Sequence, residues 1–251
     1  AFLPDNVNAI DWGACGMACF ATGSTINFFE IMDGKVNRLY SHNFRVSEIS
    51  ALKFHSINRI MAFGDTLGNL LFWDVERRGA ICSILPYAAN AKCLDICWKG
   101  NSVIALFSNN HLVSLCLNSN INTENQRRME IQWDIQLKEK YSHVSFDPNP
   151  TGYILLSCNE PQFSVYEFKP GDSKPKPFYE YVELSCPDKI QDIQWSQHFP
   201  GFIWVVLKNE IVFFHINSKT LIPMIRQRTS ASSFAKLFQF HDDYKKFIVF
   251  H

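Results

Sequence analysis

The chain has 251 residues, of which 14% are aromatic and only 19% are charged. Its 24 basic and 24 acidic side chains balance, so no overall positive field favours nucleic acid as a partner. No apolar run reaches the roughly 18 residues that a membrane-spanning helix needs, and none is typical of a signal peptide. Because the sequence begins at Ala1 and not at methionine, we expect a fragment or a processed product.

A short phrase with an aromatic ring recurs along the chain. It first occurs at Ile10 to Trp12, where an apolar residue stands two places before a ring, so that both side chains leave one face of a strand. Successive rings are 42, 44, 48, 49 and 45 residues apart, at Trp12, Phe54, Trp98, Phe146, Trp195 and Phe240. A period of roughly 40–45 residues is typical of β-propeller blades. We therefore expect each of the first five rings to be buried between neighbouring blades.

The second repeat shows the pattern of one blade. Strands are expected at 49–54, 59–63, 70–75 and 80–85, with turns where glycine, aspartate and asparagine gather. Applied along the chain, the pattern predicts blades at about 1–42, 43–86, 87–137, 138–184 and 185–226, and a partial blade at 227–251. The sequence thus predicts an all-β fold, a single incomplete β-propeller of about five and a half blades. An uncovered sheet flank is unfavourable, so we expect seven blades in the parent protein.

Two insertions fall between the third and fourth strands of their repeats. Asn118–Glu130 is polar, and Lys169–Pro177 carries three prolines among lysines and glycine. Both are predicted to be exposed loops. They are candidate contacts for a partner protein, although a plain surface insertion is the simpler interpretation of each.

The eight cysteines are expected to be reduced and mostly buried. Cys15 and Cys19 are four residues apart, as are Cys93 and Cys97, and no Cys-x-x-Cys occurs. This spacing fits neither a zinc site nor a disulfide framework. We therefore expect no metal and no cofactor, and a reducing compartment such as the cytoplasm.

One dipeptide resembles a known signature. Trp73-Asp74 ends the third strand of the second repeat, as the Trp-Asp pair does in WD40 repeats. In those repeats a histidine before the innermost strand and an aspartate in the hairpin share a hydrogen-bond network with the tryptophan. His42 and Asp65 occupy the matching positions. The resemblance implies a WD40-type propeller in which His42, Asp65 and Trp73 crosslink strands, because buried polar groups need partners.

The order of the strand phrases resembles the first propeller of the WD repeat-containing protein eleven family. The resemblance covers nearly the whole chain and is carried by Ala9–Gly13, Gly16–Ala18, Gly64–Val75, Asp192–Trp195 and Phe234–His251. It implies a large cytosolic protein of two propellers and a helical tail. With a partner protein, that family tethers endosome-derived vesicles at the trans-Golgi network, and it is linked to ciliary signalling. The resemblance carries over no catalytic residue.

Catalytic motifs are absent from the sequence. It contains no Gly-x-Ser-x-Gly, no phosphate-binding glycine loop and no His-Glu-x-x-His. The histidines are scattered, several of them near strand ends where a structural use is typical, at positions 42, 55, 111, 143, 198, 215, 241 and 251. We therefore predict a non-enzymatic scaffold, peripheral at the trans-Golgi network or vesicles, whose partners are tethering-complex subunits or cargo adaptors.

A peptide-reading module, such as a ubiquitin-ligase substrate receptor or a chromatin reader, is the alternative. Arginine-lined loops on one face would favour a reader of acidic peptides, and a large apolar blade edge would favour the scaffold. The basic pairs Arg77-Arg78 and Arg127-Arg128 are interpreted as solvated blade edges or loops. A small-molecule ligand is not expected.

Overall fold

The computed structural model describes residues 6–13, 16–32, 35–84, 90–117, 129–158, 160–169, 172–184, 189–190, 192–196, 199–207, 210–216, 221–228, 238–240 and 247–249. For Ile84, Met129, Tyr181, Glu183, Glu210 and the strands from 221 onward, only the backbone is described. The described residues form strands and no helix, which confirms the all-β prediction. None of them therefore forms a helix that could cross a membrane.

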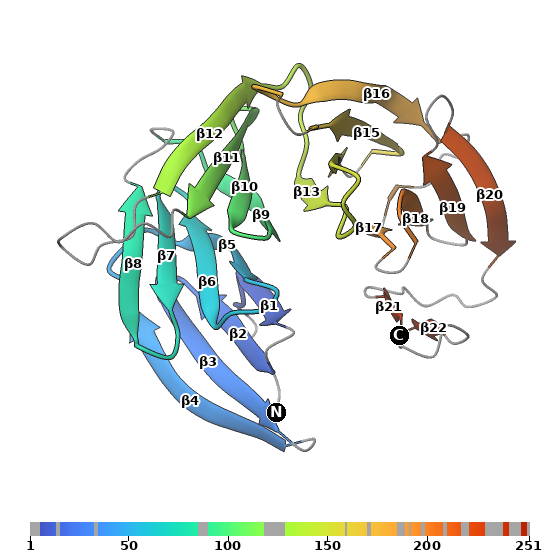
Figure 1. The fold of residues 1–251 in the computed structure, drawn as a ribbon. Coiled ribbons are helices and arrows are strands. Elements are labelled where there is room, and N and C mark those ends of the chain that lie inside the picture. The colour runs from blue at the N-terminus through green and yellow to red at the C-terminus, as the bar shows by residue number, and fades with distance from the viewer. Residues whose placement is uncertain are drawn as a thin grey trace. The chain divides into compact units, whose positions relative to one another are not determined.

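The chain divides into two compact units, Ala1–Val144 and Ser145–His251. The first holds three antiparallel sheets whose strands follow chain order (Figure 1). The first sheet contains β1 (Ala9–Gly13), β2 (Met17–Thr22), β3 (Thr25–Met32) and β4 (Lys35–Asn43). The second sheet contains β5 (Ile49–Phe54), β6 (Ile60–Asp65), β7 (Leu70–Asp74) and β8 (Gly79–Ile84). The third sheet contains β9 (Cys93–Lys99), β10 (Ser102–Phe107), β11 (His111–Leu117) and β12 (Met129–Gln136).

The second unit repeats this plan. The fourth sheet contains β13 (His143–Phe146), which begins at the boundary between the units, β14 (Tyr153–Ser157), β15 (Gln162–Glu167) and β16 (Lys176–Glu183). The fifth sheet contains β17 (Asp192–Trp195), β18 (Phe202–Val206), β19 (Glu210–Ile216) and β20 (Leu221–Arg228). A two-stranded sheet of β21 (Phe238–Phe240) and β22 (Phe247–Val249) follows. The number of blades in the parent protein and the single-domain boundaries stay predictions.

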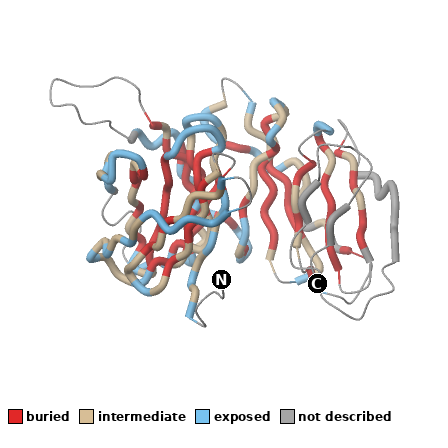
Figure 2. The backbone as a smooth tube through the Cα atoms, turned by 90° about the horizontal axis from the view of Figure 1, so that it is seen from below, coloured by how far each residue is buried: buried red, intermediate tan, exposed pale blue. Residues whose placement is uncertain are grey.

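Alternation of side chains builds each sheet. In β2, Met17, Cys19 and Ala21 are buried, whereas the residues between them are partly exposed. The buried side packs against the second sheet, in a core that also holds Phe28 and Phe63. Figure 2 shows buried residues along the strands and exposed residues concentrated in the connections. Burial of these apolar faces at about 25 cal/mol per Å² is the main stabilising contribution.

The second and third sheets approach closely at Gly64. A Cβ atom at this position would lie 2.4 Å from the Cβ of Cys93 on β9. Only glycine therefore fits, and the apolar core between these sheets closes around Cys93, Phe72 and Phe107. Burial raises the pKa of the Cys93 thiol far above its usual range, so this cysteine is an inert part of the core.

Two tryptophans of the repeat form hydrogen bonds to the preceding sheet. The indole N–H of Trp98 donates to the backbone oxygen of Lys53 at 2.9 Å, and that of Trp195 donates to Ser145 at 3.3 Å. Phe54 and Trp195 are buried, and Trp98 and Phe146 are partly buried. The predicted burial of Trp12 is wrong, because this ring is 67% exposed. It stands on the first sheet of its unit, and no described sheet of that unit precedes it.

The two predicted loops are shorter than the sequence suggested. Residues 118–128 lie outside the described residues, but Met129 and Glu130 already belong to β12. In the second insertion, residues 170 and 171 lie outside the described residues, and Lys176 and Pro177 begin β16.

Candidate functional site

Trp73 and His42 contact each other, but not through the predicted network. Their ring centroids lie 4.6 Å apart with a 34° tilt. The indole N–H of Trp73 donates to the hydroxyl of Tyr40 at 3.1 Å, and this hydroxyl donates to the backbone oxygen of Val75 at 2.9 Å. One link between the first and second sheets is thus the Trp73–Tyr40 pair, with the His42 ring packed beside Trp73. Sequence reasoning missed Tyr40, whose only signal was an aromatic residue in the fourth strand of the first repeat.

Asp65 holds a different part of the second sheet. Its side chain is fully buried. One oxygen accepts the backbone N–H groups of Leu67 and Asn69 at 3.0 and 2.9 Å. The other accepts the side-chain amide of Asn69 at 2.6 Å and the backbone N–H of Ser47 at 3.2 Å. Asp65 therefore fixes the β6–β7 hairpin and the segment that enters β5, and its described hydrogen bonds reach neither His42 nor Trp73.

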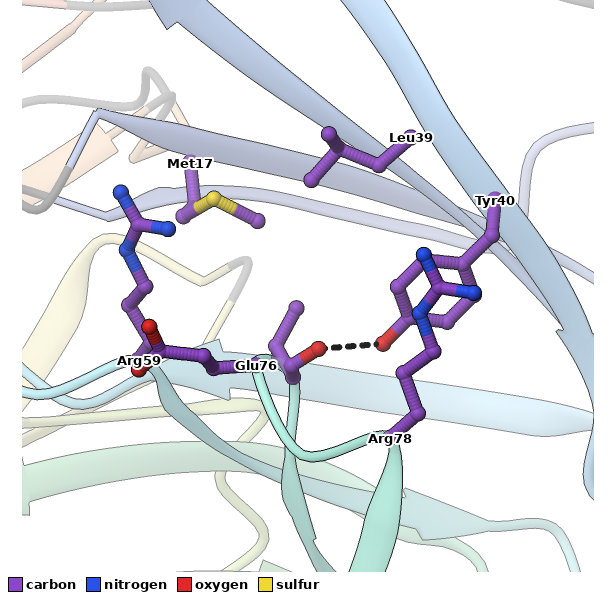
Figure 3. Close-up of a pocket in the computed structure, with 7 residues that line it drawn as sticks. Met17, Leu39, Tyr40, Arg59, Glu76 and Arg78 are labelled. Carbon is purple, nitrogen blue, oxygen red and sulfur yellow. Dashed lines mark hydrogen bonds between the residues drawn. The ribbon is translucent and has the colours of Figure 1, made fainter.

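A cavity of about 160 Å³ lies between the first and second sheets, within the first unit (Figure 3). One wall comes from the first sheet, where Met17 begins β2 and Leu39 and Tyr40 lie on β4. The other comes from the second sheet, through Arg59, which precedes β6, and the turn from Val75 to Arg78 between β7 and β8. These residues are far apart in the sequence, so only the register of the two sheets brings them together.

The cavity combines an apolar floor with a polar rim. Met17 and Val75 are buried, whereas Leu39 is 38% exposed. Burial raises the pKa of Tyr40, although its hydrogen bond to Trp73 and the charge of Arg78 act in the opposite direction. The Tyr40 hydroxyl is therefore neutral at physiological pH, and its proton is donated to the backbone oxygen of Val75.

Two arginines stand on opposite sides of the cavity, as Figure 3 shows. The guanidinium of Arg78 lies 4.6 Å from the centroid of the Tyr40 ring, a cation–π contact. Arg59 bonds the carboxylate of Glu30 at 3.0 Å. Arg77 is 83% exposed and faces Asp74 at 3.7 Å. Arg77 and Arg78 are both exposed in the turn between β7 and β8, as the interpretation of a solvated pair expects, and Arg78 in addition contacts the face of the Tyr40 ring.

The described histidines have structural surroundings. His55 is buried, and its Nδ1 accepts the backbone N–H groups of Ile57 and Asn58 at 3.0 and 3.1 Å. His111 pairs with Asp134 at 2.9 Å, and His215 stacks on Phe202. Residues 198, 241 and 251 lie outside the described part of the chain. Among the described residues, no group of three His, Cys, Asp or Glu side chains could hold a metal ion.

Comparison by sequence finds no match, either to a family model or to a curated protein. Comparison by structure does find similar folds. A protein from Lactobacillus plantarum aligns with a TM-score of 0.74 at 9% identity, over 97% of this chain and 77% of that one. The WD40 domain of Toxoplasma gondii coronin aligns with a TM-score of 0.66 at 12% identity, over 93% of this chain and 61% of that one. The fold is of the β-propeller type, as in this WD40 domain.

A third similar structure is a Bacteroides fragilis protein assigned as a 6-phosphogluconolactonase. It aligns with a TM-score of 0.70 at 11% identity, over 96% of this chain and 76% of that one. Identities this low show the fold alone, and none of these matches points to the vesicle-tethering family. Because an assigned enzyme and a WD40 domain share the fold, the functional argument rests on the site.

Proposed function

We propose that this chain is a non-enzymatic module that binds other proteins, within a single propeller. The observation that carries the proposal is the composition of the cavity between the first two sheets. Tyrosine, methionine and arginine line it, which are the residue types enriched at the centres of protein interfaces. Two rigid sheets hold these side chains in place, so little conformational entropy is lost on binding.

The size of the cavity supports a protein ligand over a cofactor. Small-molecule sites typically enclose about 300–1,000 Å³. The cavity encloses about 160 Å³, which accommodates one or two side chains of a partner. Its polar groups also suit binding better than catalysis. Tyr40 has a raised pKa and the arginines are permanently charged, so none of these three side chains is a general base at neutral pH, and Glu76 is the one lining residue with a carboxylate.

Within this class we propose a scaffold in endosome-to-trans-Golgi vesicle tethering. The resemblance of the strand phrases Ala9–Gly13 and Gly64–Val75 to the vesicle-tethering family supports this finer assignment. The partners would be tethering-complex subunits or cargo adaptors, met at the cytoplasmic surface of the trans-Golgi network. The exposed Ile10 and Trp12, on one face of β1, add apolar surface of the kind that favours a scaffold.

A peptide-reading module is the second candidate, and a specific observation favours it. Arg59 and Arg78 flank a cavity with an apolar floor, which is the arrangement expected of a reader of acidic peptides. The two candidates share the property of binding a protein and differ in the identity of the partner.

Affinity purification of the full-length protein, followed by mass spectrometry, tests the proposal. We expect membrane-traffic proteins among the partners, and a cell line without the protein should mis-sort cargo that cycles between endosomes and the Golgi while bulk secretion continues. Normal cargo retrieval, with partners that are all ligase subunits or chromatin proteins, would favour the reader. Purification without any protein partner, together with turnover of a sugar lactone by the pure protein, would contradict both candidates.

A further inference from the structure

Arg78 occupies an unfavourable backbone conformation at the rim of the cavity. Asp74 pairs with Gly79 across β7 and β8, so four residues form the turn and Arg78 is its last. Its φ angle is +53°, in the left-handed region where glycine and asparagine are preferred. An arginine here costs conformational energy, and the same backbone directs its side chain back over Tyr40. Strain of this kind is typical of positions kept for function.

Among the described residues, Arg78 is the arginine of the cavity that forms no salt bridge. In the described part of the chain, Arg59 is paired with Glu30 and Arg77 with Asp74. The described contact of the Arg78 guanidinium is the face of the Tyr40 ring. A guanidinium stacked through its face keeps the N–H groups along its edge for an acceptor, and two of these fit a carboxylate.

Apolar surface lies next to this cation. Figure 3 shows Met17 and Leu39 along the side of the cavity between Arg59 and Tyr40. Met17 is 1% exposed and forms part of the floor, and Leu39 is 38% exposed at the opening. Leu39 therefore offers the apolar contact for an aliphatic side chain, and Met17 behind it forms an adaptable part of the floor.

The geometry points to this cavity as a binding site for an acidic residue of a partner peptide together with an adjacent aliphatic residue. The peptide carboxylate pairs with the Arg78 guanidinium, and the aliphatic side chain packs on Leu39, next to the floor at Met17. This inference deepens the proposed protein-binding function and names the chemistry that the partner must present.

The charges around the cavity favour a ligand side chain with a single negative charge. Glu30 compensates Arg59, and the Glu76 carboxylate also lines the cavity. A second negative charge on the ligand would therefore face Glu76 without a free cation, and we expect an aspartate or glutamate to bind better than a phosphorylated residue.

Methionine-methyl NMR tests the inference with Met17 as reporter. The chain contains 5 methionines, so [13C]methyl-methionine labelling gives a simple spectrum, and Met17→Leu assigns the signal at the floor of the cavity. The probe is N-acetyl-Leu-Glu-amide, and its uncharged match is N-acetyl-Leu-Gln-amide. We expect a saturable shift of the Met17 signal with the glutamate peptide and affinity at least about tenfold weaker for the glutamine peptide, since a charge-assisted bond is lost.

Neighbouring arginines provide the matched variants. Arg78→Gln should weaken binding of the glutamate peptide at least about tenfold, whereas Arg77→Gln, which removes the exposed cation beside it, should change affinity less than about twofold. Glu76→Gln should strengthen binding. Replacement of the peptide glutamate by phosphoserine should weaken it.

Several results would overturn the inference. These are no saturable shift, equal affinity for the two peptides, equal loss in the two arginine variants, or tighter binding of phosphoserine. Partner capture by the full-length protein separates this site from the wider function. If the Arg78→Gln protein retains its partners and the short peptide does not bind the unsubstituted protein, the site is overturned and the protein-binding function is intact.

Discussion

The carboxylate of Asp147, directly after β13, accepts the backbone N–H of Gly201 at 3.1 Å, although the two residues are 54 positions apart. The fourth sheet is thereby joined to the turn that begins β18 in the fifth. Gly201 has a φ angle of +72°, and a Cβ there would lie 3.0 Å from the backbone oxygen of Ile216. A buried acid on one sheet and a left-handed glycine on the next thus form one link inside the second unit.

Asp147→Ala should lower the free energy of unfolding by about 3 kcal/mol, because several buried donors lose their acceptor at once. Besides Gly201, the carboxylate binds Asn149 at 2.9 Å and the Thr151 hydroxyl at 2.5 Å, and it is fully buried. Urea unfolding followed by tryptophan fluorescence measures the change. Glu160→Ala removes an exposed carboxylate of the same unit and serves as the control. Equal midpoints for the two variants would contradict the prediction.

Trp195→Ala and Trp12→Ala should differ sharply in stability. Trp195 is 5% exposed and its indole N–H bonds Ser145, so its removal should cost about 3–5 kcal/mol. Trp12 occupies the same place in its repeat but is 67% exposed, so its removal should change stability by less than about 1 kcal/mol. Thermal unfolding of the purified variants compares them. A similar loss in both would mean that a further sheet covers Trp12 in solution.

Asp65→Ala should lower the free energy of unfolding by about 1–3 kcal/mol, through the hairpin and not through a crosslink to Trp73. The donors left without an acceptor are Ser47, Leu67 and Asn69. His42→Ala, which removes a ring stacked on Trp73, should act independently, so the double variant should lose the sum of the two effects. Chemical unfolding of all three proteins tests this, and strong non-additivity would restore the single network.

The spacing of the rings made the sheets predictable, because a repeated unit must bury its apolar face against its neighbour. The exposure of Trp12 was not predictable from the recurring sequence phrase itself. The phrase places a ring on one face of a strand, but whether that face is covered depends on which sheet comes before it.

The site itself was less accessible to sequence reasoning. Tyr40 receives the Trp73 bond because register places β4 beside the second sheet, and no local pattern marks this. Arg77 and Arg78 are adjacent residues of the same type, so the sequence does not distinguish their roles. Both are exposed, but Arg78 has a left-handed φ and its guanidinium lies over the Tyr40 ring, whereas Arg77 faces Asp74.

His55 should make the protein less stable under mildly acidic conditions. Burial lowers the pKa of this histidine, and the Gly100 backbone offsets the effect only in part. Since the unfolded chain binds a proton below about pH 6.5 more readily than the folded one, stability should fall as pH drops through that value towards the lowered pKa. His55→Gln should be less stable at pH 7.5 but should lose less between pH 7 and pH 5. If urea unfolding gives parallel pH profiles for the unsubstituted protein and for His55→Gln, His55 does not contribute to the pH dependence of stability.

Replacement of Arg78 by glycine should separate two contributions to stability, the conformational strain of the turn and the contact of the guanidinium with Tyr40. Relief of the left-handed strain, about 1 kcal/mol, is offset by the greater freedom of glycine in the unfolded chain, about 0.5–1 kcal/mol. Arg45→Gly is the matched control, because Arg45 has the same φ of +53° and is also exposed. The two variants differ in the cation–π contact, so Arg78→Gly should be less stable than Arg45→Gly by about 0.5–1 kcal/mol. Equal unfolding free energies would show that the Arg78 guanidinium is not held over the Tyr40 ring, and the orientation from which the carboxylate site was inferred would then be lost.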